Sequence, residues 1–321
     1  MDYHYKHLSI DEREIARGLF DLGLSLRFIA SVLDRSPSTL SREIKRNSLC
    51  DGKYIANKAQ HKYSLRKKCC GRKNIFEDVS KQNYVKKKII EEAWTPEQIC
   101  GRAKREGIEL GYSYNTIYRA IHKGIIEKTI KKKMRYLWKY KKRKTNDKRG
   151  KIQETKSIHD RPESVEDRQE AGHWESDTVF GTRRTGCLAT HVERKSGFLI
   201  ARRLASNKAD LFNKATIEAF KDLPSKIKKS FTVDNGIEFV YHKELEEKTG
   251  MNVYFCDPYS SWQRGTNENT NGLLRQFYPK ETSFEHIDET LEHVVNLINN
   301  RPRKRLNWRT PYEVLQEILQ D

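Results

Sequence analysis

The positive charge of this chain lies almost entirely in its first half. Residues 1–150 hold 37 Lys and Arg against 17 Asp and Glu, a net charge of +20, whereas residues 151–321 hold 26 and 27, a net charge of −1. Such asymmetry is typical of a nucleic-acid-binding portion joined to a different activity. We therefore expect the first half to bind a polyanion and the second half to fold separately. A solubilising surface is the alternative for the first half.

The composition describes globular domains joined by solvated segments. A length of 321 residues is enough for two or three small domains, and 36% hydrophobic residues can form cores, while a mean hydropathy of −0.88 leaves much polar surface. The six cysteines form no C-x-x-C pair, so we expect reduced thiols and no zinc finger. No apolar run suits a signal peptide or a membrane span. The sequence predicts a soluble, cytoplasmic protein without a membrane partner.

Residues 8–47 have the pattern of three short helices. Ser9 precedes Glu12 by three residues, as in a capping box, and apolar residues follow at helical spacing. Gly23 ends this segment, Ser25 begins a second helix, and Pro37 lies in the first turn of a third. Short helices joined by tight turns predict a helix-turn-helix domain over residues 1–48.

The third helix of this domain has the composition of a DNA-reading helix. Its start is small and polar and its end is basic, which suits a first turn in the major groove and a last turn near phosphates. Arg42 is the best candidate for a guanine contact. A small helical bundle with a solvated basic face is the alternative. The predicted DNA contacts are Ser38, Thr39, Ser41, Arg42, Lys45 and Arg46.

Residues 93–124 repeat this outline more weakly. Thr95 and Pro96 begin one predicted helix, and Ser113 begins another. A structural helical hairpin fits this pattern almost as well as a DNA-binding unit. The side chains left free to contact DNA are Asn115, Thr116 and Arg119.

Basic runs surround this second helical pair. They occur at residues 63–74, 85–89 and 128–151, two of them interleaved with aromatic residues. They suit phosphate contacts whose affinity falls with salt, and charged tethers are the alternative. We assign residues 49–92 to a basic linker and residues 93–150 to a second helix-turn-helix-like region with a basic tail.

After about residue 166 the pattern changes to short strands. Residues 172–181 predict one strand, and two more, at 188–192 and 198–202, are joined by a turn. Strands at 229–236 and 251–257 then alternate with helices at 208–220, at 241–248 and from about residue 266. Strands joined by turns, followed by strands that alternate with helices, predict a mixed α/β domain over residues 166–321.

Three acids occupy informative points of this layout. Asp177 lies within the first predicted strand, Asp234 closes the fourth, and Glu268 begins the helix after the fifth. If the first and fourth strands are neighbours, the aspartates lie side by side and the helix brings Glu268 over them. Each acid alone has an ordinary explanation as a strand-end, turn or helix-start carboxylate. Glu175 rivals Asp177, since residues two apart on a strand share a face.

A cluster of three carboxylates repels itself unless cations neutralise it. Oxygen ligands without His or Cys favour Mg²⁺ or Mn²⁺ over zinc. Two such ions can activate the attacking oxygen and stabilise the leaving oxygen at a phosphodiester. The acids therefore predict Mg²⁺ as cofactor, with Mn²⁺ as a substitute and two ions in the site.

Four segments carry a resemblance to a known family. In chain order, "HWESDTVFG", "FTVDNGIEF", "DPYSSWQRGTNENTNGLLRQFYPK" and "NNRPRKRLNWRTPYEVL" are similar to the IS30 family of bacterial insertion-sequence transposases, and the similarity covers nearly the whole chain. The third segment is the most specific, and the separation of 34 between Asp234 and Glu268 fits the family's second and third acids. The resemblance implies a ribonuclease-H-like, retroviral-integrase-like fold of the DDE type. Asp177, Asp234 and Glu268 are then the catalytic and metal-binding acids, and Glu175 is a flanking residue.

The resemblance also implies supporting residues and an activity. Ser176 and Glu281 depart from it, because each stands where a glycine is common. The implied protein binds the terminal inverted repeats of its element, cuts with water and joins the freed 3′-hydroxyl to target DNA, as two or more protomers on paired ends. Four residues of the third segment are assigned to positioning the DNA or the site and are counted among the DNA-binding residues: Arg264, Asn267, Asn271 and Arg275.

Two other functions remain as alternatives. A regulator derived from a transposase would bind DNA without chemistry, although all three acids are present. A nonspecific nuclease would cut without inverted repeats and leaves the two candidate DNA-reading regions unexplained.

Overall fold

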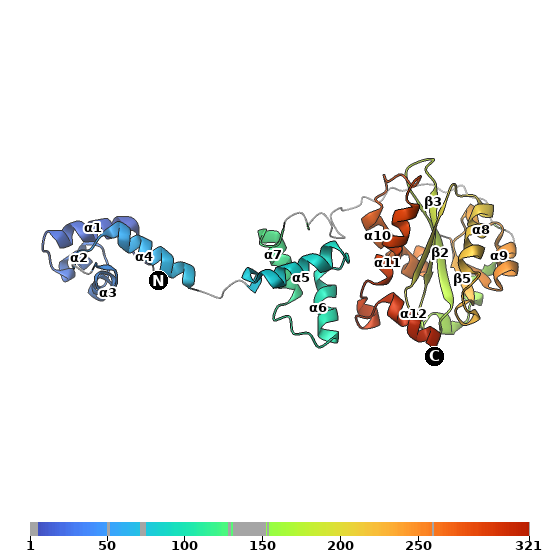
Figure 1. Cartoon of the computed structure of the whole chain (residues 1–321), viewed down its shortest axis with the longest axis horizontal. Coiled ribbons are helices and arrows are strands. Elements are labelled where there is room, and N and C mark those ends of the chain that lie inside the picture. Colours follow the sequence, from blue (N-terminus) through green and yellow to red (C-terminus); the bar gives the residue numbers. More distant parts are fainter. Residues whose placement is uncertain are drawn as a thin grey trace. The chain divides into compact units, whose positions relative to one another are not determined.

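The computed structural model describes residues 6–49, 52–70, 75–127, 130, 152, 154–258 and 260–320. They belong to two compact units, Met1–Asn74 and Ile75–Asp321 (Figure 1). The basic run at residues 128–151 lies outside the described residues except for Ile130.

The first unit confirms the three predicted helices and adds a fourth. Ser9 forms a capping box with Glu12, and the Ser25 hydroxyl accepts a hydrogen bond from the Phe28 backbone N–H. Ala16, Ile29, Ala30 and Leu40 form the small core of the unit. The helices are α1 (Ile10–Asp21), α2 (Leu26–Val32), α3 (Pro37–Asn47) and α4 (Ala56–Cys69).

The range expected to be a basic linker, residues 49–92, needs correction because most of it is helical. Helix α4 is tied to α1 by the buried Arg13, whose guanidinium donates to Gln60 Oε1 at 2.5 Å. Helix α5 (Val79–Ile90) buries Val85 and Ile89 in the core of the second helical region. Only a few small or apolar residues lie on the inner faces of these helices, so the basic outer faces dominate the sequence pattern.

The second helical region contains both predicted helices. Thr95 and Gln98 form a capping box at the start of α6 (Pro96–Arg105), and Gly124 ends α7 (Tyr114–Lys123) in a left-handed conformation. These helices and α5 share a core that includes Phe76, Trp94, Ile99, Ile117 and Ile121.

This region contacts the carboxyl-terminal segment of the same unit. Arg102 forms a two-pronged ion pair with Glu313, with N–O distances of 2.6 and 2.7 Å. Arg301 donates from Nε to Gln98 Oε1 at 2.9 Å. A Cβ on Gly101 would collide with the Trp308 ring, so the glycine permits the close approach. Side-chain contacts therefore connect the two regions predicted as separate domains, residues 93–150 and 166–321.

One six-stranded sheet forms the centre of the mixed α/β domain. Strands β2, β3 and β4 are antiparallel neighbours, while β5, β6 and the short β1 continue from β2 in parallel. The order is β1-β6-β5-β2-β3-β4. Every predicted strand is present, and β1 is additional. The strands are β1 (Lys156–Ser157), β2 (His173–Phe180), β3 (Cys187–Glu193), β4 (Leu199–Leu204), β5 (Ser230–Val233) and β6 (Asn252–Phe255).

Helices cover both faces of the sheet (Figure 1). One face packs on α8 (Ala209–Phe220) and α9 (His242–Thr249), together with α12 (Pro311–Gln320). The other packs on α10 (Gly265–Phe277) and α11 (Asp288–Asn299). Side chains alternate along β2, so Trp174 enters the first core and Val179 the second. Glu175 and Asp177 therefore face α10.

Candidate active site

Asp177 and Asp234 lie at the same level on neighbouring strands. Strand β2 pairs in parallel with β5, with Glu175 opposite Thr232. Two further residues along each chain bring Asp177 level with Asp234, as expected if the first and fourth predicted strands are neighbours. Both carboxylates remain partly open, with 27% and 33% of their side-chain surfaces exposed.

Arg264 connects the two aspartates. Its guanidinium lies 3.3 Å from Asp177 Oδ1 and 2.9 Å from Asp234 Oδ2, and it also donates to the Ser176 carbonyl at 3.0 Å. The side chain is only 10% exposed. A buried cation therefore offsets part of the negative charge of the two carboxylates in this structure.

The turn after Asp234 is held by an acid that the sequence interpretation overlooked. Glu238 is buried and accepts a hydrogen bond from Thr178 Oγ1 at 2.7 Å. A Cβ on Gly236 would collide with the Glu238 carboxylate, so this position favours glycine. The Gly236 backbone N–H donates to Asp234 Oδ1 at 2.9 Å. In the sequence, Glu238 could have been noticed because it follows Asp234 by four residues, with an Asn-Gly turn between them.

Glu175 and Asp177 have different surroundings although they share a face. Glu175 is 1% exposed, and its carboxylate accepts from Arg194 and from the Asn267 backbone N–H, each at 2.8 Å. The Asn267 amide donates to the Glu175 carbonyl at 2.9 Å. Glu175 thus caps the first turn of α10 and fixes it on β2, while Asp177 is the partly open acid.

Helix α10 places Asn271 over Asp177 and leaves Glu268 at the solvent edge. Asn271 Nδ2 donates to Asp177 Oδ2 at 3.1 Å. Glu268 is exposed and lies one helical turn earlier, on the same side of α10 as Asn271. Across the described part of the chain, no three His, Cys, Asp or Glu side chains are grouped closely enough to hold a metal ion. The structure thus brings Asp177 and Asp234 together and does not bring Glu268 into contact with them.

The electrostatics at Asp177 favour an added cation. Burial raises the pKa of the Asp177 carboxyl, the positive charge of Arg264 lowers it, and the negative charge of Asp234 raises it again, with a net increase. The positive charge of Arg264 therefore does not fully offset the cost of keeping the Asp177 carboxylate ionised.

The donor set fits a hard divalent cation. Two carboxylates face the site, and Asn271 Oδ1 is buried without a hydrogen-bond partner among the described residues. These are oxygen donors, which Mg²⁺ and Mn²⁺ prefer. The Arg264 guanidinium already places a positive charge between the two aspartates. A metal cation at the same place would therefore suit the chemistry of the site.

Ser176, one of the departures from the family pattern, points to the opposite face of the sheet. Its hydroxyl lies 2.8 Å from Nδ1 of the fully buried His191, whose Nε2 lies 3.3 Å from Thr216 Oγ1. Because the Thr216 hydroxyl donates to the Phe212 carbonyl, His191 Nε2 carries the proton and Ser176 donates to Nδ1. Ser176 therefore supports the core behind Asp177 and does not enter the site.

The residues of the third segment that were assigned to the DNA or the site make contacts within the protein. Asn267 is fully buried, and Arg264 and Asn271 contact the aspartates. Arg275 donates to the Phe180 carbonyl at 2.6 Å and thereby ties the end of α10 to β2.

The residues predicted to read DNA lie on outer helix surfaces. In α3, Ser38, Ser41, Arg42, Lys45 and Arg46 are exposed and Thr39 is half-buried. Arg42 folds back on Ser38, donating to its carbonyl at 3.1 Å. In α7, Asn115 and Arg119 are exposed and Thr116 is half-buried.

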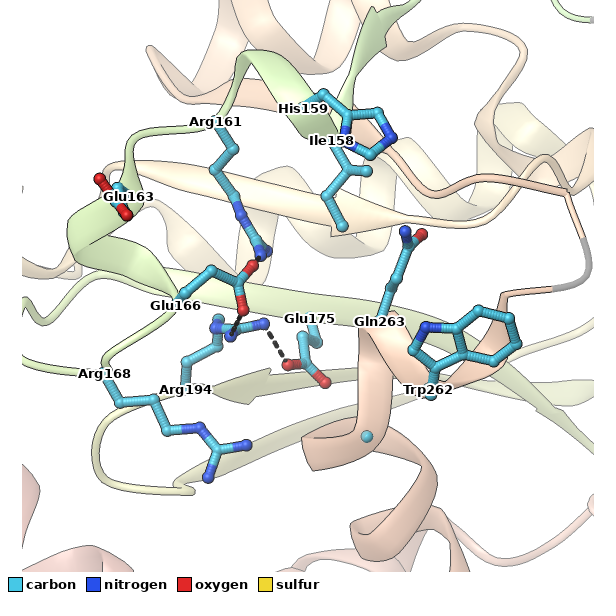
Figure 2. A pocket seen from close by; sticks show the side chains of 11 residues that line it. Ile158, His159, Arg161, Glu163, Glu166, Arg168, Glu175, Arg194, Trp262 and Gln263 are labelled. Carbon is cyan, nitrogen blue, oxygen red and sulfur yellow. Dashed lines mark hydrogen bonds and ion pairs between the residues drawn. The ribbon is translucent and has the colours of Figure 1, made fainter.

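The sequence interpretation also missed a pocket next to the acids. Its volume is about 580 Å³. Figure 2 shows Arg161, Arg194 and Glu166 on one side and Trp262 with Gln263 on the other. Trp262 and Gln263 belong to the third segment, whereas the arginines and Glu166 come from distant parts of the sequence, so no single motif marks the pocket.

Comparisons with known proteins identify the family. A helix-turn-helix domain model matches residues 4–47, and an integrase core domain model matches residues 167–261, ending before Glu268. The InsI transposase of insertion element IS30A from Escherichia coli is 38% identical over 97% of this chain and 83% of its own length. The transposase of IS4351 from Bacteroides fragilis is 35% identical, covering 98% and 97%. The chain belongs to the IS30 family of insertion-sequence transposases.

Family membership establishes the class of activity and fold. The protein is a DDE-type transposase with a DNA-binding helix-turn-helix region and an integrase-like α/β core, and it cleaves and joins DNA strands. Integrase-core transposases generally use divalent metal ions. The catalytic core domain of BIV integrase is a structural neighbour with a TM-score of 0.37 and 20% identity, covering 46% of this chain and 95% of that one. Among the described helices, none has the length and apolarity needed to cross a membrane.

Proposed function

We propose that this transposase binds the terminal inverted repeats of its own element through α1–α3 and performs cleavage and strand transfer at Asp177, Asp234 and Glu268. The observation that carries the site assignment is the pair of partly open aspartates at one level of β2 and β5, connected by a buried arginine. Two ordinary surface acids would not require such a cation.

In this proposal the chain's residues form a rigid frame around the reacting phosphodiester. Strands β2 and β5 fix Asp177 and Asp234, and Glu175 fixes the start of α10. Glu268, exposed at that start, turns its long side chain inward when DNA and cations neutralise the cluster. Arg264 then leaves its bridging position and can contact the DNA phosphate.

Asp177, Asp234 and Glu268 would hold two Mg²⁺ ions, with Mn²⁺ as a substitute, and Asn271 would orient Asp177 through its hydrogen bond to Oδ2. When bound, the ions supply activation of the attacking oxygen and stabilisation of the leaving oxygen. The attacking group is water in cleavage and the freed 3′-hydroxyl in strand transfer. Pairing of two ends requires at least two protomers, which we propose as the active assembly.

The test uses a supercoiled plasmid carrying the sequences that flank the gene, with purified full-length protein and Mg²⁺ or Mn²⁺. We expect wild type to nick and join the ends, and Glu268→Gln to lose both activities while still binding the DNA. Glu281→Gln, another exposed acid, serves as the matched control and retains activity. An active Glu268→Gln protein would overturn the assignment, and binding without cleavage by wild type would favour a regulator.

A further inference from the structure

The pocket beside the acids has the size of a ligand site. Its volume of about 580 Å³ lies within the usual range for small-ligand pockets. Its lining comes from residues 158–168, from Glu175 and Arg194, and from Trp262, Gln263 and Gly265 (Figure 2).

Two buried guanidinium groups form one side of this pocket. The side chains of Arg161 and Arg194 are 1% and 4% exposed. Arg161 donates to Thr232 Oγ1 at 2.9 Å, and Arg194 donates to Glu175 Oε1 at 2.8 Å. Burial and the charge of Arg194 together lower the pKa of Arg161 to about 10. The pocket therefore places three arginines, Arg161, Arg168 and Arg194, among three glutamates, Glu163, Glu166 and Glu175.

Glu166 is the partner that the two arginines share. Its carboxylate forms an ion pair with Arg161 and accepts from Arg194 Nη2 at 3.2 Å. The Glu166 side chain is 60% exposed, unlike the buried arginines. Departure of this exposed carboxylate would leave the two buried guanidinium groups short of negative charge. A phosphate group can then replace it, because guanidinium groups bind phosphate oxygens in a two-pronged geometry.

The other side of the pocket offers a surface for a base. The Trp262 side chain is among the most exposed large hydrophobic groups of the described residues, at 73%. Exposed aromatic rings beside basic side chains stack on unpaired bases. No neighbouring atom lies within 4 Å of the position of a Cβ on Gly265, so space remains at the start of α10.

The pocket adjoins the candidate active site through one short segment. Gln263 and Gly265 line the pocket, and Arg264 between them contacts Asp177 and Asp234. Glu175 lines the pocket two residues before Asp177. A DNA strand with a phosphodiester at the acids therefore has its next nucleotide within reach of the pocket.

We propose that this pocket receives one unstacked nucleotide of the DNA strand undergoing cleavage, with its phosphate on Arg161 and Arg194 in place of Glu166 and its base on Trp262. This inference rests on the proposed function, because it needs the DNA to lie at Asp177 and Asp234. The charge of Glu166 then keeps the arginines neutralised until DNA arrives.

Photochemical cross-linking tests the proposal without requiring cleavage. Full-length protein is irradiated with a DNA duplex whose short single-stranded overhang carries 5-iododeoxyuridine, and the cross-linked residues are mapped by mass spectrometry. We expect a cross-link at Trp262. Glu166→Gln should raise its yield several-fold, whereas Asp167→Asn, the exposed neighbour, should leave it unchanged. Trp262→Ala should abolish this cross-link and preserve binding of the duplex, measured by fluorescence anisotropy.

Two results would overturn the inference. Binding of the duplex without a cross-link at Trp262 would exclude the pocket and leave the proposed function intact. A Trp262 cross-link whose yield Glu166→Gln does not change would mean that DNA passes over the ring outside the pocket. Absence of both binding and cross-links would count against DNA binding itself and hence against the proposed function as well.

Discussion

At the scale of single residues, Glu175 and Asp177 show how two acids on one strand face acquire different roles. Glu175 is buried between Arg194 and the start of α10, whereas Asp177 is partly open and faces Asp234. The alternation of side chains allowed either to be the first acid of the site. Burial and hydrogen-bond partners, which depend on distant residues, separate them.

Neutralising these two acids should change stability in opposite directions. Glu175→Gln leaves Arg194 with less compensation and should lower the free energy of unfolding by about 3 kcal/mol. The folded-state pKa of Asp177 is raised, so its ionised form reduces stability at neutral pH. Asp177→Asn should therefore leave the free energy of unfolding unchanged or raise it. Urea titration measures both, and a large loss in Asp177→Asn would contradict this account.

His191 should make the catalytic core sensitive to acid. Burial lowers its pKa from 6.5 to about 3, with the charge of Arg202 contributing. Between these values the unfolded chain binds a proton that the folded chain does not, so stability falls as pH falls, by up to about 1.4 kcal/mol per pH unit. Urea titrations at about pH 7 and about pH 5 should show this dependence.

Two variants test whether the proton that causes this pH dependence binds to His191. His191→Phe should weaken the pH dependence of unfolding, while His286→Gln, at an exposed position, should preserve it. An unchanged pH dependence in His191→Phe would show that another group is responsible.

At the scale of elements, β4 is an edge strand that a side chain from α11 completes. Asn299 accepts from the Leu199 backbone N–H at 2.8 Å and donates to its carbonyl at 2.9 Å. Asn299 is 2% exposed. The amide therefore takes the place of a neighbouring strand.

Removing this amide should weaken the sheet edge. Asn299→Ala leaves two backbone groups without partners and should lower the free energy of unfolding by about 2–4 kcal/mol. Asn300→Ala is the control, since its exposed amide donates to the Asn296 carbonyl of the preceding helical turn and supports no strand. Equal losses in the two variants, measured by urea titration, would contradict the role of Asn299.

The elements themselves were largely predictable, and their exceptions have physical causes. Period-two patterns and turn residues located β2 to β6, and capping residues located α1, α2 and α6. Strand β1 has two residues, too few to show a period. Helices α4 and α5 were missed because basic residues mask their narrow buried faces. Arg264 was expected near DNA, and only the fold shows it between the acids.

At the scale of the whole molecule, DNA recognition and chemistry belong to different units. The first unit presents the basic end of α3, and the second contains the acids. A substitution that impairs the function of one unit should therefore leave the stability of the other unit unchanged.

Arg42→Ala tests this separation. It should weaken binding to the element ends about 10-fold, because a guanine-reading arginine contributes on the order of 1–3 kcal/mol. Arg17→Ala removes an exposed arginine that pairs with Glu14 and Asp21 on α1, and should bind nearly as wild type. Fluorescence anisotropy with labelled end DNA at fixed salt gives both values. Equal binding by Arg42→Ala and wild type would exclude α3 as the reading helix.

The most direct measurement of the central claim, that three acids form one metal site, locates the metal on the chain itself. Full-length protein bound to the DNA of its element ends is loaded with Fe²⁺ in place of Mg²⁺, and hydroxyl radicals generated at the iron cut the nearby backbone. The account predicts cuts close to Asp177, Asp234 and Glu268, suppressed by excess Mg²⁺ and lost in Glu268→Gln but not in Glu281→Gln. Cuts elsewhere, or cuts near the two aspartates that Glu268→Gln leaves unchanged, would contradict it.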